Sequence, residues 1–231
     1  MLLSIIVPVL NEAATLPAFL DHLQPLRRAG HQLIVVDGGS TDESMSIAES
    51  LADRVLQCPP GRAQQMNRGA AQAAGEWLLF LHADTWLPQP AQQWLALMQA
   101  SPRIWGRFNV RLSGQRRCFR LIETLMNWRS RVTGIATGDQ AIFIRREHFE
   151  RLAGFAEIAL MEDVELSRRL RRISRPLCLK QPVRTSSRRW EEAGVLRTIL
   201  LMWQLRLRFF LGANPDDLVR RYYPSRKLSQ P

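Results

Sequence analysis

Short apolar runs alternate with helical segments along the first 81 residues, and this alternation constrains the fold more than any other feature. The strand-like runs share apolar, often β-branched residues: Leu3–Val9, Leu33–Val36, Arg54–Gln57 and Glu76–Leu81. Helical apolar spacing fills the intervals between them: 12–28, 42–52 and 61–74. Strands that alternate with helices are joined by right-handed crossovers and form a parallel sheet. The sequence therefore predicts an α/β fold with a mostly parallel, Rossmann-like sheet flanked by helices.

The pattern becomes looser after residue 88. The segments with helical spacing are 91–100, 118–132 and 162–172, and those with strand-like composition are 106–112 and 141–144. No linker rich in proline, glycine or serine separates the two halves of the chain. We therefore expect them to share one folded body.

Charge is distributed unevenly along the chain. Residues 1–100 carry 5 basic and 9 acidic side chains, whereas residues 101–231 carry 27 basic and 12 acidic ones. This asymmetry indicates an anionic partner for the second half. A nucleic-acid-binding function would also account for it. No helix-turn-helix, zinc or RNP-like motif accompanies the charge, however, and we expect no nucleic-acid partner.

The first ten residues are apolar but lack the basic start and the small-residue cleavage site of a signal peptide. We therefore expect a buried first strand and a cytoplasmic protein. The three cysteines are widely spaced and include no Cys-x-x-Cys pair: Cys58, Cys118 and Cys178. They predict neither a zinc site nor a disulfide framework.

Polar side chains follow three of the predicted strands, and a further acidic pair lies later in the chain. The four clusters are Asn11 with Glu12, Asp37 to Asp42, His82 to Asp84, and Glu162 with Asp163. Ligands of a parallel α/β sheet bind beyond the carboxyl ends of its strands, so we expect these clusters to converge. Several carboxylates gathered there suit a nucleotide and a hard cation.

Each acidic cluster also has a structural interpretation. Asp37, beside two glycines, can accept hydrogen bonds from a base or ribose or stabilise a turn, whereas Asp42 suits a helix cap. Asp84 follows an apolar strand, where it can bind Mg²⁺ or Mn²⁺ or cap the next turn. At the start of a helix, Glu162 and Asp163 can serve as caps, or one of them can deprotonate an acceptor hydroxyl.

In their order along the chain, four motifs resemble those of the family 2 glycosyltransferases, which have the GT-A fold. The motifs are Pro8–Glu12, Val36–Asp42, Leu81–Thr85 and Glu162–Asp163. Residues 67–76 resemble the helix between the donor motifs of that family, and the similarity covers residues 3 to about 175. Residues 61–67 and the His-Ala-Asp variant most resemble a small bacterial subgroup associated with radical-SAM and selenium gene neighbourhoods.

The resemblance implies roles for individual residues. The donor-binding set is Pro8, Asn11, Glu12, Asp37, Gly38, Arg62, His82 and Asp84. Within it, Asp37 matches the acid that recognises the base, usually uracil, and Asp84 matches the metal-binding acid of the Asp-x-Asp motif. Asp163 matches the catalytic base, with Glu162 beside it. The acceptor-side set is Gly138, Asp139, Gln140, Arg189 and Trp190.

The resemblance also implies a division of labour: a nucleotide-sugar-binding half over 1–100, a catalytic and acceptor-binding half over 101–190, and a basic, apolar helical extension over 191–231. The expected reaction moves one sugar from a nucleotide-diphosphate donor, a UDP-sugar, to a hydroxyl acceptor with inversion and with Mg²⁺ or Mn²⁺ as cofactor. The basic half favours an anionic or lipid-linked acceptor. Nucleotidyl transfer is the alternative, although no glycine-rich, lysine-containing loop follows the first strand.

Two departures from the family pattern bear on these expectations. His82 stands where the first acid of Asp-x-Asp would be, and imidazole can contact either metal or ribose. Residues 186–190 resemble a degraded Gln-x-x-Arg-Trp motif, with Ser186 in the glutamine position. That motif accompanies processive synthases, so we expect transfer of a single sugar. Arg189 and Trp190 can equally pack against the flank of the sheet.

Residues 195–211 form the most apolar late segment, but three arginines interrupt it. Its uninterrupted apolar length is far below the ~20 residues that cross a bilayer. The spacing predicts an imperfect amphipathic helix, suited to core packing, to oligomer contact or to peripheral docking on anionic lipid. Nearby basic residues favour the lipid: Arg220, Arg221, Arg226 and Lys227.

Overall fold

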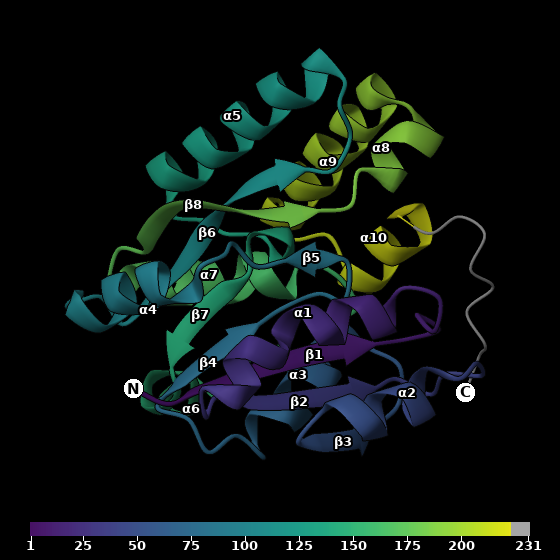
Figure 1. The fold of residues 1–231 in the computed structure, drawn as a ribbon. Helices are drawn as coiled ribbons and strands as arrows, with labels where there is room; N and C mark the ends of the chain where they lie inside the picture. The colour runs from purple at the N-terminus through teal and green to yellow at the C-terminus, as the bar shows by residue number, and fades with distance from the viewer. Residues whose placement is uncertain (223–231) are drawn as a thin grey trace.

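The computed structural model describes residues 1–222, in which eight strands form one sheet in the order β3-β2-β1-β4-β7-β6-β8-β5 (Figure 1). The strands are β1 (Leu3–Val9), β2 (Gln32–Asp37), β3 (Arg54–Gln57), β4 (Trp77–Phe80), β5 (Thr85–Trp86), β6 (Trp105–Leu112), β7 (Ile142–Arg145) and β8 (Leu177–Thr185). Arg226 and Lys227, which were expected to favour lipid contact, lie outside the described residues.

Helices connect these strands and extend beyond them. They are α1 (Leu16–Arg28), α2 (Ser44–Leu51), α3 (Arg62–Ala70), α4 (Ala91–Ala100), α5 (Arg117–Thr133), α6 (Arg146–Arg151), α7 (Glu162–Ile173), α8 (Arg188–Ala193), α9 (Val195–Phe210) and α10 (Pro215–Tyr222), with a short 3₁₀ helix η1 (Gly138–Gln140). The fold is thus a single α/β domain with a helical C-terminal extension, as the sequence predicted.

The first four strands are parallel, which confirms the prediction from their alternation with helices. In the register of β1 and β2, Val9 lies beside Asp37, so the polar residues that follow the two strands emerge at the same edge. Helix α1 begins later than predicted, at Leu16, because Glu12 and its neighbours form a turn: the carbonyl of Glu12 accepts the N–H groups of Thr15 and Leu16.

The second half of the sheet is mixed rather than parallel. Strand β7 is antiparallel to β4 and β6, while β8 is parallel to β6 and antiparallel to β5. The sequence analysis did not predict β8, because Lys180 and Pro182 interrupt its apolar pattern. A bulge at Phe108 and Asn109 of β6 shifts the register of the pair, so that Pro182 lies beside Asn109.

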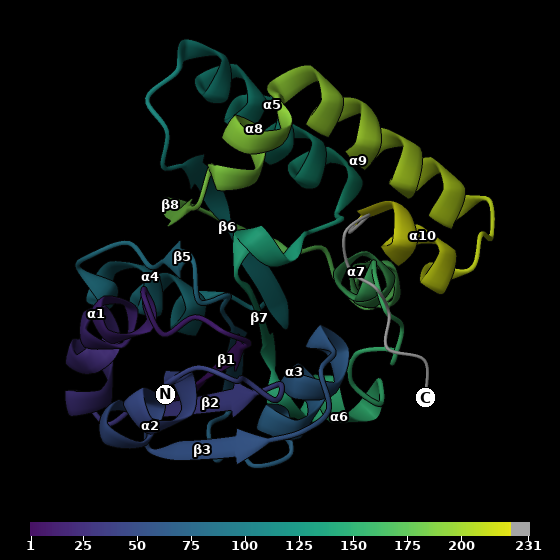
Figure 2. The ribbon, with the colours of Figure 1, turned by 90° about the vertical axis from the view of Figure 1, so that its right-hand side faces the viewer.

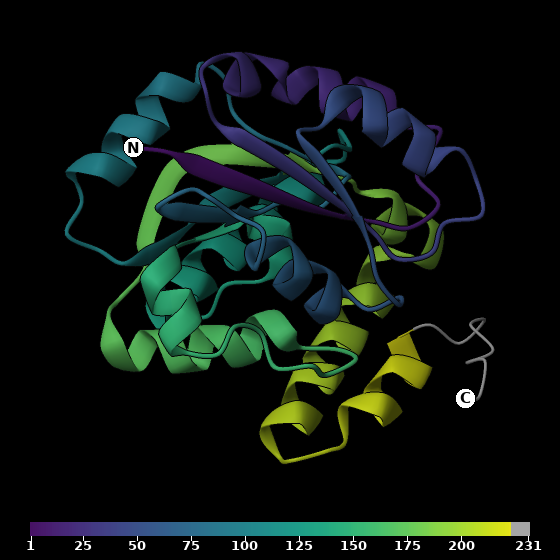
Figure 3. The same ribbon diagram turned by 90° about the horizontal axis from the view of Figure 1, so that it is seen from below.

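Helices cover both faces of the sheet (Figure 3). Side chains of α1, α2 and α4 form one core with Val7, Val35 and Leu79, and side chains of α3, α6 and α7 form a second core with Ile6 and Val36. Because both faces are covered, the central strands are almost continuously buried.

A further layer of helices lies beside the second half of the sheet, where α5, α8 and α9 are neighbours (Figures 1 and 2). Phe119 and Ile122 of α5 pack with Trp190 of α8 and with Val195 and Ile199 of α9. Across residues 1–222, no helix combines the length and the apolar character needed to span a bilayer.

The close pairing of β6 with β7 and β8 depends on Gly106. A Cβ atom at Gly106 would lie 2.3 Å from the carbonyl oxygen of Leu177 and 2.4 Å from Cζ of Phe143. We expect Gly106→Ala to lower the free energy of unfolding by about 3 kcal/mol, at the upper end for overpacking because one obstacle is backbone. Urea unfolding followed by circular dichroism measures this change.

Gly61→Ala is the matched control, since a Cβ atom there would meet nothing closer than 3.7 Å. It should cost under about 1 kcal/mol, the penalty for alanine at a helix N-cap. Equal effects of the two substitutions would refute the steric explanation.

Candidate active site

Hydrogen bonds tie the loop after β1 to the loop after β2. Asn11, whose φ of 55° is in the left-handed region, accepts the N–H of Thr41 at 2.8 Å with its side-chain oxygen. Its own N–H donates to Oγ of Ser40 at 2.9 Å. Asp42 accepts the N–H of Ala13 and that of Ser44, the first residue of α2, each at 3.0 Å, although the N-cap residue of that helix is Glu43. The loops that carry Asn11, Glu12 and Asp37 therefore form one unit.

Asp37 is buried at the end of β2, where its carboxylate serves its own loop. Oδ2 accepts the N–H groups of Gly39 and Ser40, both at 2.9 Å, and Oδ1 accepts the hydroxyl of Ser40. Asp37 therefore stabilises its own turn. A nucleobase bound here would have to donate to the carboxylate lone pairs that these hydrogen bonds leave free. Pro8 lies beside Val36 in the same register, one step before the loops.

Gln65 of α3 joins the ends of these strands, and sequence reasoning missed it. Its buried amide donates to the carbonyl oxygens of Val9 at 2.9 Å and Val36 at 2.8 Å. A Cβ atom at Gly38 would lie 3.0 Å from this amide, which accounts for the glycine there. Gln64 and Gln65 are adjacent and identical in type, so only the helix phase, known from the structure, tells which one is buried.

The acidic pair Glu162 and Asp163 begins α7, immediately after Met161 in a left-handed conformation. Oδ2 of Asp163 accepts the N–H of Gly138 at 2.7 Å, and Oδ1 accepts the N–H of Val164 at 2.6 Å. Burial raises the pKa of Asp163, while these two hydrogen bonds oppose the rise. Burial, followed by the charge of Asp163, raises the pKa of Glu162 well above its usual range.

A small cleft of about 10 Å³ at the start of α7 contains His82. It is lined by Met66, Phe80, His82, Gly138, Ile142, Phe155, Glu162 and Asp163. The imidazole lies against Gly138, where a Cβ atom would be 2.5 Å from Cε1 and 2.6 Å from Nε2. Burial, followed by the charge of Arg62, lowers the pKa of His82 to about 3, so the ring is neutral at physiological pH.

Arg62, at the start of α3, contributes positive charge to this cleft. It lowers the pKa of Glu162 as well as that of His82, so its charge acts on residues that follow β4 and on residues that begin α7. The structure therefore brings His82 together with the sequence-distant pair Glu162 and Asp163, and the charge of the exposed Arg62 acts on His82 and Glu162.

Asp84 is exposed beyond the end of β4. Its Oδ1 accepts the hydroxyl of Thr85 at 3.1 Å, and Thr85 in turn contacts the hydroxyl of Thr185 on β8 at 3.0 Å. No set of three or more acidic, histidine or cysteine side chains in residues 1–222 could by itself enclose a metal ion. One exposed carboxylate near a neutral imidazole fits a hard cation that takes its other ligands from a diphosphate and water.

The acceptor-side loop, η1, is organised by its own side chains. Gln140 is fully buried, and its side chain accepts the N–H of Thr137 at 3.3 Å, while its own N–H donates to the carbonyl of Thr137 at 2.8 Å. Gln140 therefore supports the loop. Asp139, half-buried, accepts the hydroxyl of Thr137, and Gly138 supplies the N–H that holds Asp163.

Arg189 and Trp190 lie in α8, where both take part in packing. The guanidinium of Arg189 stacks on the ring of Tyr222 at 3.6 Å, and Trp190 packs against Phe119 and Ile122 of α5. These contacts match the packing interpretation of the two residues. Their contact with an acceptor stays a prediction.

Arg129 near the end of α5 is a residue that sequence reasoning did not single out, because the chain has 30 arginines. Its Nε and Nη2 atoms are buried and have no hydrogen-bond partner within residues 1–222. Burial, followed by the charge of Arg206 on α9, lowers the pKa of Arg129 to about 10, so the group stays protonated at neutral pH. Asp139 and Asp163 act in the opposite direction, which places this cation beside the acidic cluster.

A sheet of this topology, with polar loops gathered at the carboxyl ends of its first strands, has the GT-A architecture of glycosyltransferases. The profile described as "Glycosyl transferase family 2" matches residues 4–152. The chain therefore belongs to glycosyltransferase family 2.

Named relatives agree with this assignment. A "PGL/p-HBAD biosynthesis glycosyltransferase" of Mycobacterium bovis is 46% identical over 88 residues, which cover 35% of this chain and 34% of the relative. The "Glucosyl-3-phosphoglycerate synthase" of Mycobacterium tuberculosis is 32% identical over 98 residues, 38% of this chain and 30% of the relative. The chain thus spans about a third of the length of the curated relatives it matches.

Solved structures share the fold. A mannosyltransferase from Pyrobaculum calidifontis, in complex with GDP-Man and Mn²⁺, aligns with a TM-score of 0.61 and 23% identity over 80% of this chain and 56% of its own. The glucosyl-3-phosphoglycerate synthase of M. tuberculosis, in complex with Mn²⁺ and UDP, aligns at 0.63 and 21% over 92% and 79%. TarS from S. aureus aligns at 0.65 and 16% over 99% and 74%.

The coupling of α3 to the strand ends is testable through Gln65. We expect Gln65→Met to lower the free energy of unfolding by about 2 kcal/mol, since it removes two buried hydrogen bonds at a net ~1 kcal/mol each. Chemical denaturation provides the measurement. Gln64→Met, at the exposed neighbouring position, is the control and should change stability by less than ~0.5 kcal/mol. A neutral Gln65→Met would show that the amide does not hold the loops.

Proposed function

We propose that this protein transfers a single sugar from a nucleotide-diphosphate donor, a UDP-sugar, to a hydroxyl acceptor with inversion. The observation that carries the proposal is Asp163, a largely buried carboxylate of raised pKa that is oriented by Gly138 and faces a cleft shared with His82. A general base needs this combination of fixed position and a pKa moved toward neutrality. Asp163 is accordingly the base, and Glu162 is its neighbour.

The chemistry is an in-line displacement. Asp163 takes the proton of the acceptor hydroxyl as that oxygen attacks the anomeric carbon of the donor. The bond from the anomeric carbon to the diphosphate oxygen breaks, and the electron pair leaves with the nucleoside diphosphate. Attack from the face opposite to the leaving group inverts the configuration of the new linkage.

The donor is assigned to the edge where β1, β2 and β4 end. Pro8, Asn11, Glu12, Asp37 and Gly38 would contact the nucleoside, and support comes from the hydrogen bonds that unite their loops. Structural neighbours were solved with GDP-Man or UDP, and we favour UDP because Asp37 matches an acid that usually recognises uracil.

Asp84 and His82 are the residues that would hold a divalent cation, Mg²⁺ or Mn²⁺, and two structural neighbours were solved with Mn²⁺. When bound, the cation neutralises diphosphate charge and favours departure of the leaving group. Arg62 would supplement this charge on the protein side, as its effect on His82 and Glu162 indicates. His82 alternatively contacts the ribose.

An anionic acceptor suits the other side of the cleft. Gly138 and Asp139 would line it, and Arg129 offers buried donors that have no hydrogen-bond partner within residues 1–222. We retain Gln140, Arg189 and Trp190 as acceptor-side residues only through the loop or helix that each supports.

The division of labour among 1–100, 101–190 and 191–231 and the radical-SAM-associated subgroup also belong to the proposal. So do a cytoplasmic location and peripheral membrane contact through α9.

The metal-dependent donor site predicts the outcome of calorimetric titrations with UDP and GDP. We expect UDP to bind in the presence of Mn²⁺, and its affinity to fall at least about tenfold with EDTA or in Asp84→Ala, because diphosphate charge would then be uncompensated. Asp21→Ala, an exposed acid on α1, should bind UDP as the unmodified protein does. Binding of neither nucleotide under any condition would contradict the proposed donor.

The base assignment predicts a split between binding and turnover. Asp163→Asn should retain UDP affinity but lose about 100- to 10,000-fold in kcat, the usual contribution of a general base. Since the active form is the carboxylate and burial raises its pKa, activity of the unmodified protein should fall as pH drops through that raised pKa. Asp139→Asn removes a negative charge that contributes to the rise and should move this fall to lower pH. Full turnover in Asp163→Asn, measured as UDP release from a UDP-sugar with acceptor, would refute the role.

A further inference from the structure

Two neighbouring helices carry most of the exposed large apolar side chains. Of twelve such residues in the described part of the chain, ten lie on α5 or on α9 and the residue that follows it. They are Leu121, Leu125, Trp128 and Val132 on α5, and Leu196, Leu200, Trp203, Leu207, Phe210 and Leu211 on or after α9. Scattered apolar residues need no explanation, but a contiguous patch of this kind marks an interaction surface.

On each helix these residues form one stripe. The spacing of four, three and four positions along 121, 125, 128 and 132 puts them on a single helical face, and 196, 200, 203 and 207 repeat that spacing. Each stripe includes one tryptophan, Trp128 on α5 and Trp203 on α9. Their side chains are 64% and 67% exposed, so both rings are open to a binding partner.

The two stripes belong to one surface. The opposite faces of α5 and α9 pack together through Ile122 and Ile199, with Trp190 of α8 beside them. Figures 1 and 2 show α5, α8 and α9 as neighbouring helices at the periphery of the molecule. The outward stripes therefore flank one another as the outer surface of this helical layer.

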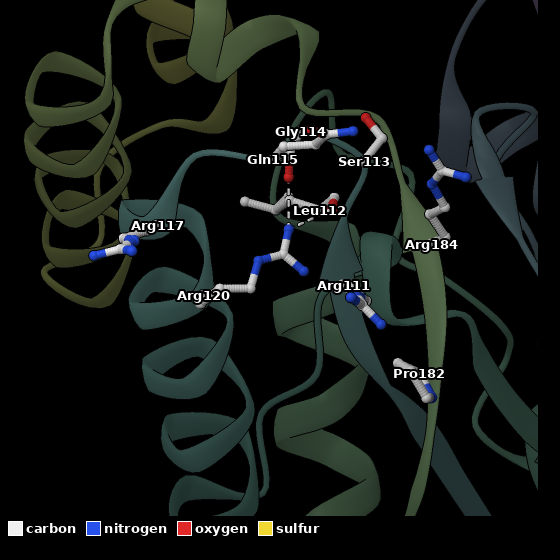
Figure 4. A pocket seen from close by; sticks show the side chains of 9 residues that line it. All are labelled: Arg111, Leu112, Ser113, Gly114, Gln115, Arg117, Arg120, Pro182 and Arg184. Carbon is white, nitrogen blue, oxygen red and sulfur yellow. Dashed lines mark hydrogen bonds between the residues drawn. The ribbon is translucent and has the colours of Figure 1, made fainter.

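An arginine-rich groove lies at the start of α5. It has a volume of about 570 Å³ and is lined by Arg111, Leu112, Ser113, Gly114, Gln115, Arg117, Arg120, Pro182 and Arg184, with no acidic residue among them (Figure 4). Arg111 of β6 and Arg184 of β8 lie side by side in the register of the sheet. Arg117 precedes Leu121 by one helical turn, so the groove adjoins one end of the apolar stripe.

The arginines of the groove differ in whether an acidic side chain neutralises their positive charge. Arg120 donates to the carbonyl oxygens of Leu112 at 3.0 Å and Gly114 at 2.6 Å and pairs with Glu123 at 3.1 Å. Within residues 1–222, the side chains of Arg111, Arg117 and Arg184 make no ion pair. A concave group of unpaired guanidinium groups is suited to phosphate oxygens, which arginine binds in bidentate fashion.

Building on the membrane contact of α9 in the proposed function, we propose that the outer face of α5 and α9 together docks on an anionic lipid bilayer, with lipid phosphate headgroups bound in the groove of Arg111, Arg117, Arg120 and Arg184. Amphipathic helices lie in the membrane interface with their apolar face inserted and their cationic side chains at the headgroups. Tryptophan favours the same level, because its ring is apolar and its N–H is polar. A bilayer satisfies both the apolar stripes and the groove, whereas a second copy would bring another protein of net charge +11 against this basic surface.

Vesicle co-sedimentation of the full chain tests the proposal independently of sugar transfer. The protein should bind vesicles of equal parts phosphatidylcholine and phosphatidylglycerol, bind phosphatidylcholine alone much less, and lose binding as salt is raised. The double change Trp128→Gln and Trp203→Gln should weaken binding at least about tenfold, as expected for withdrawal of two large apolar side chains from the interface. Leu97→Gln on α4, at a position 46% exposed and outside the two stripes, should leave binding unchanged.

The groove is tested separately by Arg111→Gln and Arg184→Gln. Each change should weaken binding to the mixed vesicles about fivefold at low salt and less at high salt, the effect expected for one basic residue near an anionic surface. Arg103→Gln, at an exposed arginine outside the groove, is the charge-matched control. Circular dichroism checks that every variant is folded.

Several results would overturn the proposal. Absence of binding to the mixed vesicles at low salt would do so, as would equal binding by the tryptophan variant or equal losses in the groove and control arginine variants. Self-association in sedimentation velocity that the tryptophan variant abolishes, without vesicle binding, would assign the surface to a second copy. Binding of inorganic phosphate that depends on Arg111 and Arg184, without vesicle binding, would assign the groove to a soluble anion.

Discussion

The candidate site depends on the hydrogen bond from the backbone N–H of Gly138 to the carboxylate of Asp163, 2.7 Å long. The donor lies in η1 and the acceptor begins α7, so the bond joins elements separated by β7, α6 and a loop. The other side of Gly138 faces the ring of His82, which leaves no space for a side chain at this position. The end of β4, the loop η1 and the start of α7 therefore meet at one peptide group, and a displacement of any of them would move the carboxylate.

The charges around this bond explain why histidine is compatible with position 82, two residues before Asp84. Glu162 is buried and the adjacent Asp163 is largely buried, and the charge of Asp163 already raises the pKa of Glu162. Another carboxylate against Gly138 would add to this repulsion at low dielectric, whereas the neutral imidazole of His82 does not. With His82 in place of the first acid of the Asp-x-Asp motif, the exposed Asp84 is the carboxylate that the motif retains.

How well the sequence predicted the structure depends on whether local pattern or tertiary contact decided each feature. The bounds of β1, β3 and α4 agree with the apolar pattern because these elements are regular, and Pro90 and Ser101 bound α4. Strand β8 is held by its pairing with β6 in spite of Lys180 and Pro182, so no local pattern announces it. Likewise, only tertiary contacts distinguish Gln65 and Arg129 from their neighbours. The amide of Gln65 binds two strand-end carbonyls, and Nε and Nη2 of Arg129 are buried without a hydrogen-bond partner among residues 1–222.

The positive charge of the second half, which the sequence analysis attributed to one anionic partner, serves several physical roles. Arg107 is fully buried and binds the carbonyls of Phe108 and Asn127, so its charge contributes to the fold. Helix α5 combines two other roles in consecutive residues, because neighbouring side chains on a helix point about 100° apart. Trp128 faces outward in the apolar stripe, while Nε of the adjacent Arg129 is buried beside the acidic cluster. One helix therefore carries both an outward-facing apolar stripe and a buried cation whose charge acts on Asp139 and Asp163.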